Sequence, residues 1–247
     1  MKNKLLPVFI IASFLSLAFF SCTKKSEKIT GDYGKRYFPL TKGHSITYEV
    51  DSTLWDNVFD VRTIHRYQMM WTVVDTFRDE TNRISYRIQT YIRTQDTATW
   101  NAHRTILVTP TESTLEYVEA GLRFIKLTFP VQNGNTWKGN SLIHADLDAD
   151  YKYFYNWDYY YSNFDQPYNT GAAYFDNTVT VNAINDTTGN PEVNPDRYAE
   201  KTFAKEVYGH DVGMVYREIV RWTYDPSLPG TPFRSGYSVV MRAINHN

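Results

Sequence analysis

The sequence of 247 residues lacks most of the features that would reveal a chemistry. Its single cysteine, Cys22, leaves no possibility of a disulfide within the chain. No His-Glu-x-x-His metal motif, Gly-x-Ser-x-Gly nucleophile elbow or glycine-rich phosphate loop occurs in it. Acidic and basic residues nearly balance, at 27 and 26, whereas a nucleic-acid partner requires a basic patch. We therefore expect no cofactor, no nucleic-acid partner and no enzymatic activity, although a catalytic triad assembled from distant residues stays open.

Long apolar runs are also missing, with one exception at the N-terminus. Lys2 and Lys4 precede an apolar stretch from Leu5 to Phe20, which is the layout of a secretory signal peptide. The stretch is shorter than the roughly 20 residues that a membrane-spanning helix needs. The sequence therefore predicts export rather than a helical membrane anchor.

The stretch LSLAFFSC, residues 15–22, resembles the lipobox of bacterial lipoproteins, except that Phe19 replaces the usual aliphatic residue. The resemblance implies cleavage before Cys22 and acylation of that cysteine. Stable anchoring takes more than one acyl chain, so a triacylated Cys22 would hold the protein on a membrane. The alternative is a soluble secreted protein with a free thiol. We expect a signal peptide at 1–21, a flexible polar tether at 22–36 and one folded domain at 37–247.

The expected mature chain has few helix formers and many strand formers. It holds nine leucines but twenty tyrosines, with many threonines and valines. In residues 83–93, RISYRIQTYIR, apolar and polar side chains alternate with a period of two. Similar alternation predicts apolar faces at 67–73, 216–224 and 237–241, and residues 196–206 are compatible with a short helix or a strand. We predict an all-β fold, a single curved antiparallel sheet or half-barrel of roughly ten strands, with little helix apart from the signal peptide.

Three segments together resemble a family of Bacteroidota cell-envelope lipoproteins: YFPLTKGHSITYEV (37–50), FPVQNGNTWKGN (129–140) and FAKEVYGHDVGMVYREIV (203–220). The resemblance implies an outer-membrane lipoprotein with an antiparallel sheet akin to the half-barrel of lipoprotein carriers, and it implies no catalytic residues. Independently of the family, Gly209 and Gly213 bracket His210 and Asp211 in a pattern that predicts a tight hairpin with positive backbone dihedrals.

Aromatic residues are abundant and concentrate in YKYFYNWDYYY, residues 151–161. As a strand, this segment would present one aromatic face about 30 Å long. Tyrosine and tryptophan rings stack on sugars or acyl chains while their polar tips form hydrogen bonds, so this face is the candidate ligand-binding site; the alternative is that the rings fill the core. The candidate residues are the odd-numbered ones, Tyr151, Tyr153, Tyr155, Trp157, Tyr159 and Tyr161.

An imidazole and three carboxylates alternate just upstream, at His144, Asp146, Asp148 and Asp150. Side by side, they could bind calcium or another hard cation through oxygen ligands. The calcium-loop pattern fails, however, because Tyr151 stands at the position that requires glycine. Solvated carboxylates in a turn are the alternative interpretation.

These patterns favour a non-enzymatic, lipid-anchored envelope protein that binds an apolar or amphipathic ligand, a lipid or glycan, or a partner protein. The alternatives are a structural or assembly accessory of an outer-membrane complex and, third, a hydrolase. The residues after Cys22 carry one acid, Glu27, among three lysines. This favours the periplasmic face of the outer membrane over the cell surface.

Overall fold

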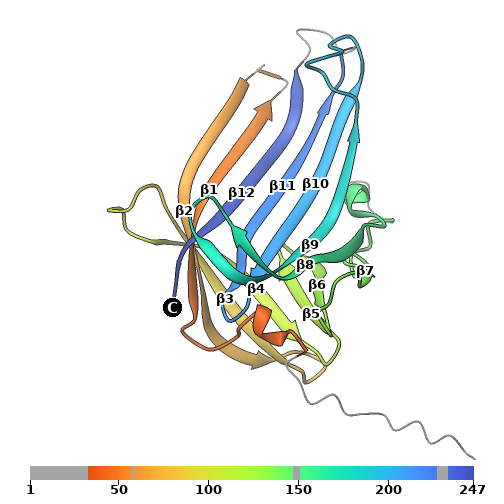
Figure 1. Cartoon of the computed structure of the whole chain (residues 1–247). Coiled ribbons are helices and arrows are strands. Elements are labelled where there is room, and N and C mark those ends of the chain that lie inside the picture. The colour runs from red at the N-terminus through yellow and green to blue at the C-terminus, as the bar shows by residue number, and fades with distance from the viewer. Residues whose placement is uncertain (1–32, 57, 60, 147–150, 227–232) are drawn as a thin grey trace, which may run out of the picture. The chain divides into compact units, whose positions relative to one another are not determined.

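The computed structural model describes residues 33–56, 58, 59, 61–146, 151–226 and 233–247 (Figure 1). Within these ranges, the regular elements are strands and two 3₁₀ turns, η1 (Lys35–Tyr37) and η2 (Lys152–Phe154). The strands are β1 (Ser45–Asp56), β2 (Val61–Arg78), β3 (Ile84–Arg93), β4 (Asn101–Pro110), β5 (Thr114–Glu119), β6 (Leu122–Thr128), β7 (Thr136–Lys138), β8 (Asp158–Asn169), β9 (Tyr174–Thr188), β10 (Ala199–Gly209), β11 (Gly213–Tyr224) and β12 (Arg234–His246).

All of these strands belong to one antiparallel sheet, in the order β6-β5-β4-β3-β2-β1-β12-β11-β10-β9-β8-β7. Every strand pairs with its neighbour in the sequence, except that β6 and β7 form the two edges and β1 pairs with β12 in the middle. The prediction of a single curved antiparallel sheet with little helix is confirmed, with twelve strands instead of about ten.

The sheet curves until its two edges meet. The backbone N–H of Ile125 in β6 donates to the carbonyl of Gly139, 2.7 Å away, and the indole of Trp137 in β7 donates to the Ile125 carbonyl at 2.8 Å. The Tyr161 hydroxyl on β8 donates to the carbonyl of Thr128 and accepts from its N–H, at 2.9 and 2.8 Å. These bonds satisfy edge groups that would otherwise be open to another strand. The sheet is therefore a nearly closed barrel with a concave inner face.

In the middle of the sheet, the side chains that the alternation assigns to an apolar face lie on this inner face. Trp71 and Val73 of β2 are buried, as is Met241 of β12. In β3 the pattern is broken at its first residue: Ile84 is 51% exposed, whereas Ser85 is buried and hydrogen-bonded to Thr109 at 2.7 Å. The β2–β3 pairing also contains a β-bulge between Val73 and Asp75, and its extra residue lies in β2, where it changes which β2 side chains face inward.

The predicted hairpin at 209–213 is confirmed as the β10–β11 turn, and the ambiguous segment 196–206 is largely strand. Gly213 has a φ of 102° and Asp211 a φ of 63°, so the positive dihedrals fall on one glycine and on an aspartate. Asp211 also forms an ion pair with Arg36, and its N–H donates to the carbonyl of Arg36. The turn is thereby joined to the first described residues of the domain.

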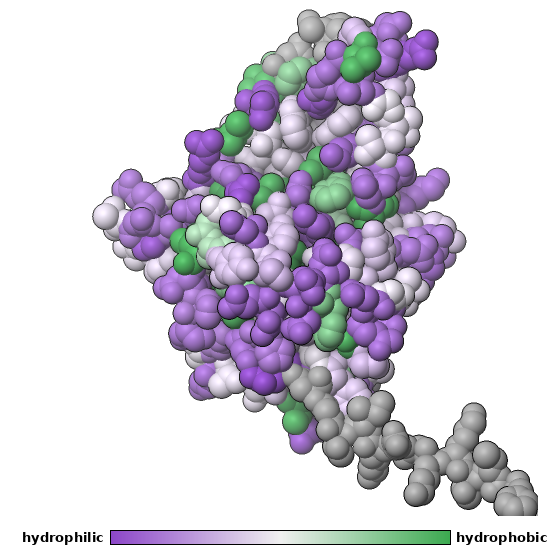
Figure 2. Space-filling model, in the orientation of Figure 1, coloured by the Kyte–Doolittle hydropathy of each residue, from purple (hydrophilic) through white to green (hydrophobic). Residues whose placement is uncertain are grey.

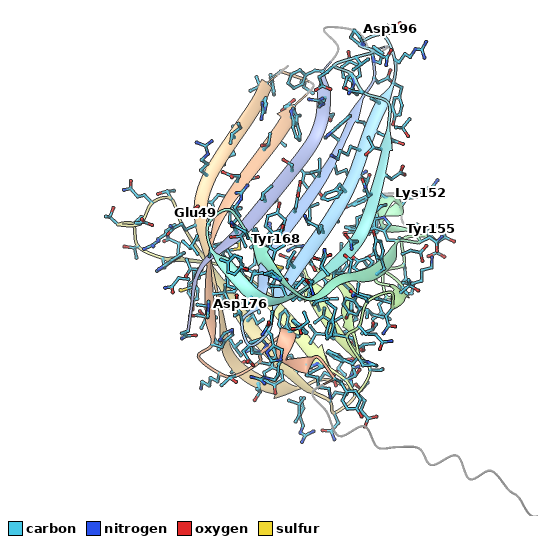
Figure 3. The ribbon with its side chains drawn as sticks, in the orientation of Figure 1. Glu49, Lys152, Tyr155, Tyr168, Asp176 and Asp196 are labelled. Carbon is cyan, nitrogen blue, oxygen red and sulfur yellow. The ribbon has the colours of Figure 1, made fainter. Side chains whose placement is uncertain are left out.

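The second half of β8 and the start of β9 leave the inner wall and cross the outer face of the sheet. Residues Asn163 and Asp165 have positive φ values, and the β8–β9 register shifts between Ser162 and Gln166. Beyond this bend, the Tyr168 ring lies 5.5 Å from that of Tyr216 in β11 (Figure 3). The hairpin therefore covers part of the outer face.

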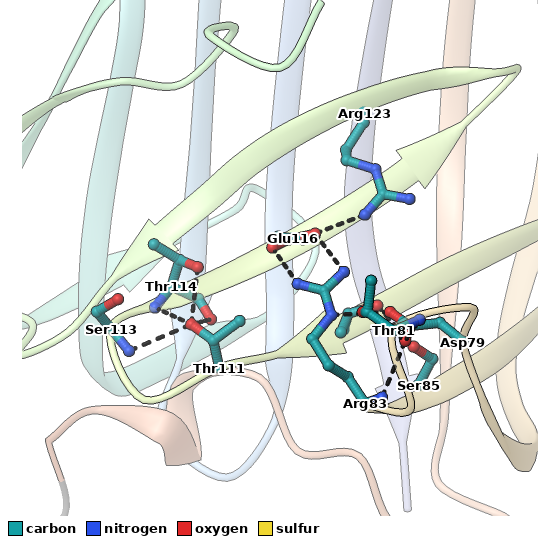
Figure 4. A network of polar contacts seen from close by, with 10 residues as sticks. Asp79, Thr81, Arg83, Ser85, Thr111, Ser113, Thr114, Glu116 and Arg123 are labelled. Carbon is teal, nitrogen blue, oxygen red and sulfur yellow. Dashed lines mark hydrogen bonds and ion pairs between the residues drawn. The ribbon is translucent and has the colours of Figure 1, made fainter.

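A polar network joins the β2–β3 turn to the β5–β6 hairpin (Figure 4). Arg83 donates to Asp79 at 2.8 Å and to both carboxylate oxygens of Glu116 at 2.7 and 3.2 Å, and Arg123 donates to Glu116 at 2.6 Å. Desolvation opposes ionisation of Asp79, but hydrogen bonds from Arg83 and Thr81 outweigh it and lower its pKa to about 2. The pKa of Glu116 is lowered in the same way, because its two arginine partners outweigh desolvation.

The described part of the predicted tether, residues 33–36, is packed on the domain. The carbonyl of Tyr33 accepts from Val131, and Gly34 approaches the Val131 side chain so closely that a β-carbon would overlap it. All the strands lie C-terminal to these residues, so a chain that begins at Asp32 keeps the whole sheet and its core. Among the described residues there is no helix with the length and apolar character needed to cross a membrane.

Candidate functional site

The concave face encloses a cavity of about 330 Å³, a volume in the range of small-molecule sites. One wall is aliphatic: Met69 of β2, Val239 and Met241 of β12, Ile219 of β11 and Ala204 of β10. Aromatic rings from β2, β6, β8, β12 and the η2 segment complete the lining: Tyr67, Trp71, Phe124, Tyr153, Phe154, Trp157, Tyr159 and Tyr237. On the face that Figure 2 shows, hydrophobic residues form separate patches among hydrophilic ones. The apolar lining of the cavity suits a ligand with an apolar part.

A buried set of four charges forms the floor of this cavity: Lys126, Glu206, Arg217 and Glu119. Lys126 of β6 and Glu206 of β10 come from strands that are not neighbours in the sheet, and their Nζ and Oε1 atoms lie 2.6 Å apart. Arg217 of β11 donates to Glu119 of β5 at 3.0 Å, and its Nε lies 3.4 Å from Glu206. We refer to these four residues as the charge quartet. Its charges sum to zero, so the floor is internally neutralised.

Burial dominates the electrostatics of the charge quartet. Lys126 and Glu206 are only 5% and 6% exposed. Burial raises the pKa of Glu206, but the cations of Lys126 and Arg217 outweigh it, and the net pKa lies below its ordinary value. Burial lowers the pKa of Lys126 despite the neighbouring carboxylate. The Tyr208 hydroxyl donates to the second oxygen of Glu206 at 2.6 Å, so each oxygen of this carboxylate accepts a hydrogen bond.

The rim of the cavity, in contrast to its floor, carries a cation that is not held in an ion pair with any described residue. The Arg221 guanidinium of β11 lies 3.5 Å above the Tyr153 ring of η2, a stacking that fixes the plane of the arginine. Burial raises the pKa of Tyr153 to about 12, its contact with Tyr237 adds to the rise, and Arg221 opposes it. Among the described residues, no carboxylate forms an ion pair with Arg221. The rim therefore holds an oriented cation without a counter-charge.

A β-bulge shapes the opposite part of the rim. Between Gln89 and Tyr91 of β3 the pairing with β4 skips a residue, which gives β4 an extra residue there. Thr90 bonds both the N–H and the carbonyl of Arg104, each at 2.9 Å. Both His103 and Arg104 line the cavity as a result. Bulges often re-aim side chains beside functional sites, and this one adds a second cation to the rim.

The structure corrects the prediction of one aromatic strand over 151–161. Residues 151–157 form the η2 turn and a reversal at Asn156, whose φ is 63°, and β8 starts only at Asp158. The six candidate aromatics therefore separate. Tyr153, Trp157 and Tyr159 line the cavity. Tyr161 is buried in the edge contact with β6, Tyr151 is exposed, and Tyr155 is 63% exposed and points away from the sheet (Figure 3).

The candidate metal ligands divide between described and undescribed residues. His144 and Asp146 are exposed in the turns before η2, and Asp148 and Asp150 lie outside the described residues. In the part of the chain that the structure describes, no three or more His, Cys, Asp or Glu side chains are grouped as a metal site would need. Cys22, the candidate lipid attachment residue, also lies outside the described ranges.

The sequence analysis missed the charge quartet. Counting back along both strands from the hairpin at 209–213 would pair Glu206 with Tyr216. In the structure Glu206 pairs with Arg217, because a β-bulge between Val207 and Tyr208 adds a residue to β11, and no sequence pattern marks that bulge. Lys126 could not be assigned from a strand pairing either, because its contact with Glu206 spans the cavity.

The comparison with known proteins gives a structural likeness of low similarity. No family model matches the chain, and no curated protein matches it. A crystal structure from Bacteroides fragilis, described as that of a candidate exported protein with a YmcC-like fold, aligns with a TM-score of 0.39 and 10% identity. The alignment covers 85% of this chain and 98% of that one.

Proposed function

We propose that this chain is a lipid-anchored protein of the cell envelope that binds an apolar or amphipathic ligand in its concave cavity and catalyses no reaction. The observation that carries the proposal is the cavity of about 330 Å³, with an aliphatic wall and an aromatic rim. Its floor charges are held in ion pairs at 2.6 and 3.0 Å. Burying an apolar ligand surface against such a wall stabilises a complex by about 25 cal/mol for each Å² removed from water.

The ligand part of this proposal is tested by native mass spectrometry of the protein extracted from its own cells. We expect a fraction of the protein to retain a lipid or another amphiphile, released when the protein is denatured. A retained glycan without an apolar part would redirect the proposal towards sugars. A uniformly empty mass under conditions that preserve known complexes would contradict ligand binding.

The membrane part rests on acylation of Cys22 and is tested separately. In the Cys22→Ser variant we expect the protein to move from the membrane pellet to the soluble fraction, because the acyl chains are the proposed attachment. Continued sedimentation of this variant with the membranes would contradict the anchor. Protease treatment of intact cells then tests the periplasmic face, where the chain should be protected until the outer membrane is opened.

A structural or assembly role in an outer-membrane complex is the second candidate, and exposed apolar side chains favour it. At the β1–β2 turn, Val58 and Phe59 are exposed, the latter at 75%, and Tyr174 is exposed at the start of β9. Aromatic residues are enriched at protein interfaces. A photo-crosslinker at Phe59 should then yield one dominant envelope partner that a crosslinker at Glu80, in the β2–β3 turn, does not. Equal patterns at both positions would contradict this candidate.

A further inference from the structure

The charges around the cavity are distributed unevenly between its floor and its rim. On the floor, two cations and two carboxylates neutralise one another. Glu206 accepts hydrogen bonds from Lys126 and Tyr208, and Arg217 Nε lies 3.4 Å from it. On the rim, Arg221 and Arg104 line the cavity, and neither has an ion-pair partner among the described residues. The cavity as a whole therefore keeps an excess of positive charge at its mouth, where a ligand enters.

The surroundings of Arg221 resemble a prepared anion site more than a solvated surface arginine. Its neighbours by strand register, Thr202 on β10 and Tyr237 on β12, are uncharged. Its guanidinium is stacked on Tyr153, which restricts it and lowers the entropy lost when a ligand binds. Two carboxylates share this face: Glu200 of β10 lies two residues from Thr202 and accepts from the Tyr198 hydroxyl at 2.7 Å, and Asp186 of β9 pairs in register with Thr202. Neither forms an ion pair with Arg221.

The wall below this rim narrows the ligand class further. Met69, Ile219, Val239 and Met241 present aliphatic groups that offer no hydrogen bonds. A saccharide placed there would leave hydroxyl groups without partners, which is unfavourable in a buried site. An aliphatic chain in the same position has no hydrogen-bonding groups that would be left unpaired. The wall and the rim together select for a molecule that is aliphatic at one end and acidic at the other.

We propose that the ligand is an anionic amphiphile, with its acidic group bound at the rim by Arg221 beside the hydroxyls of Tyr153 and Tyr237, and its aliphatic part against the wall. This inference rests on the proposed function and specifies its ligand class. Arg104 adds to the positive potential of the rim. The charges of the charge quartet sum to zero, so the floor presents no net charge to the aliphatic part of the ligand. Carboxylate and phosphate head groups share the chemistry that Arg221 recognises.

The inference is tested by isothermal titration calorimetry on residues 32–247, which keep the complete sheet. The two ligands are dodecanoate and its neutral isostere dodecanamide, each below its micelle concentration. We expect dodecanoate to bind roughly tenfold tighter or more, because hydrogen bonds to charged groups are worth at least that ratio. A third titration uses dodecyl phosphate, which carries a phosphate head group on the same aliphatic chain. Tighter binding of dodecyl phosphate than of dodecanoate would assign the head group to phosphate.

Three variants test whether Arg221 causes the preference for dodecanoate over dodecanamide. In Arg221→Gln the dodecanoate-to-dodecanamide ratio should fall close to one while dodecanamide affinity is unchanged. Arg221→Lys should keep part of the ratio, because it keeps the charge but loses the planar stacking. Arg66→Gln is the matched control: Arg66 lies on the outer face, paired in register with Asp51, and its loss should leave the ratio unchanged.

The outcomes separate this inference from the function on which it rests. Equal binding of both ligands by the unaltered protein, or an unchanged ratio in Arg221→Gln, would overturn the anionic ligand but leave an apolar-binding cavity. Equal weakening of both ligands in Arg221→Gln would also overturn it, because that pattern indicates a structural role for the arginine. Failure of all these amphiphiles to bind the unaltered protein would contradict the proposed function itself.

Discussion

Substitution of Glu206 by glutamine tests how much the charge quartet contributes to the fold. The carboxylate is 6% exposed and accepts hydrogen bonds from Lys126 and Tyr208, both at 2.6 Å. Glutamine keeps the shape but removes the charge. Lys126 would then be a buried cation without a carboxylate partner, whereas Arg217 would keep Glu119 at 3.0 Å. The substitution therefore leaves Lys126, and not Arg217, without a carboxylate partner.

The magnitude follows from the burial of the pair. Removing one partner of a buried ion pair typically destabilises a protein by about 3–5 kcal/mol. At about 2–4 °C per kcal/mol for a domain of this size, the melting temperature should fall by roughly 10 °C. Urea unfolding of residues 32–247, followed by tryptophan fluorescence, measures the change in the free energy of unfolding.

A second variant distinguishes an unpaired charge from lost packing. In the double variant Lys126→Met/Glu206→Gln, no buried cation is left without a partner, and most of the lost stability should return. A double-mutant cycle then gives the coupling between the two residues. The reasoning is refuted if Glu206→Gln alone changes stability by less than about 1 kcal/mol, a value typical of an exposed pair, or if the double variant is as unstable as the single one.

Three further predictions concern the sheet. Tyr161→Phe leaves the buried edge of β6 without its two hydrogen bonds and should lower the free energy of unfolding by about 1–3 kcal/mol in a urea titration, whereas an unchanged midpoint would show that water replaces them. Gly236→Ala should destabilise the protein more than Gly171→Ala, measured by thermal unfolding: both glycines have positive φ, but only at Gly236 would a β-carbon overlap the neighbouring strand. Arg83→Gln should destabilise the protein at pH 7 but not near pH 2. The two carboxylates that pair with Arg83 have lowered pKa values, so their stabilisation is complete above their ordinary values of 3.8 and 4.5 and is lost as the pH falls towards about 2; equal destabilisation at both pH values would contradict this assignment.

The sequence predicts the sheet well because strand formation is largely a local property. The period of two in residues 83–93 and 237–241 reflects one buried face, and the glycines at 209 and 213 mark the reversal between β10 and β11. The curvature, in contrast, depends on contacts such as those of Tyr161 with Thr128. These contacts join residues that are distant in the sequence, and no local pattern encodes them.

The candidate site was only partly predictable for a related reason. Alternating aromatics at 151–161 are compatible with a strand, but they carry no information about the positive φ of Asn156 that turns the chain before β8. Three of the six aromatics nevertheless reach the cavity, because Tyr153 belongs to η2 and Trp157 and Tyr159 lie where β8 enters the sheet. Arg221 escaped notice because its importance lies in the absence of an ion-pair partner among the described residues, which only the folded sheet reveals.

Filling the cavity tests the central claim most directly. Ala204 is buried on the cavity wall, and Ala204→Trp would place an indole in the space assigned to the ligand. Asn185→Trp adds the same group at an exposed position, on the opposite face next to Phe203. In native mass spectrometry of both variants extracted from their cells, the account predicts a retained amphiphile on Asn185→Trp and an empty Ala204→Trp protein that still folds. An amphiphile retained equally by both variants would contradict it.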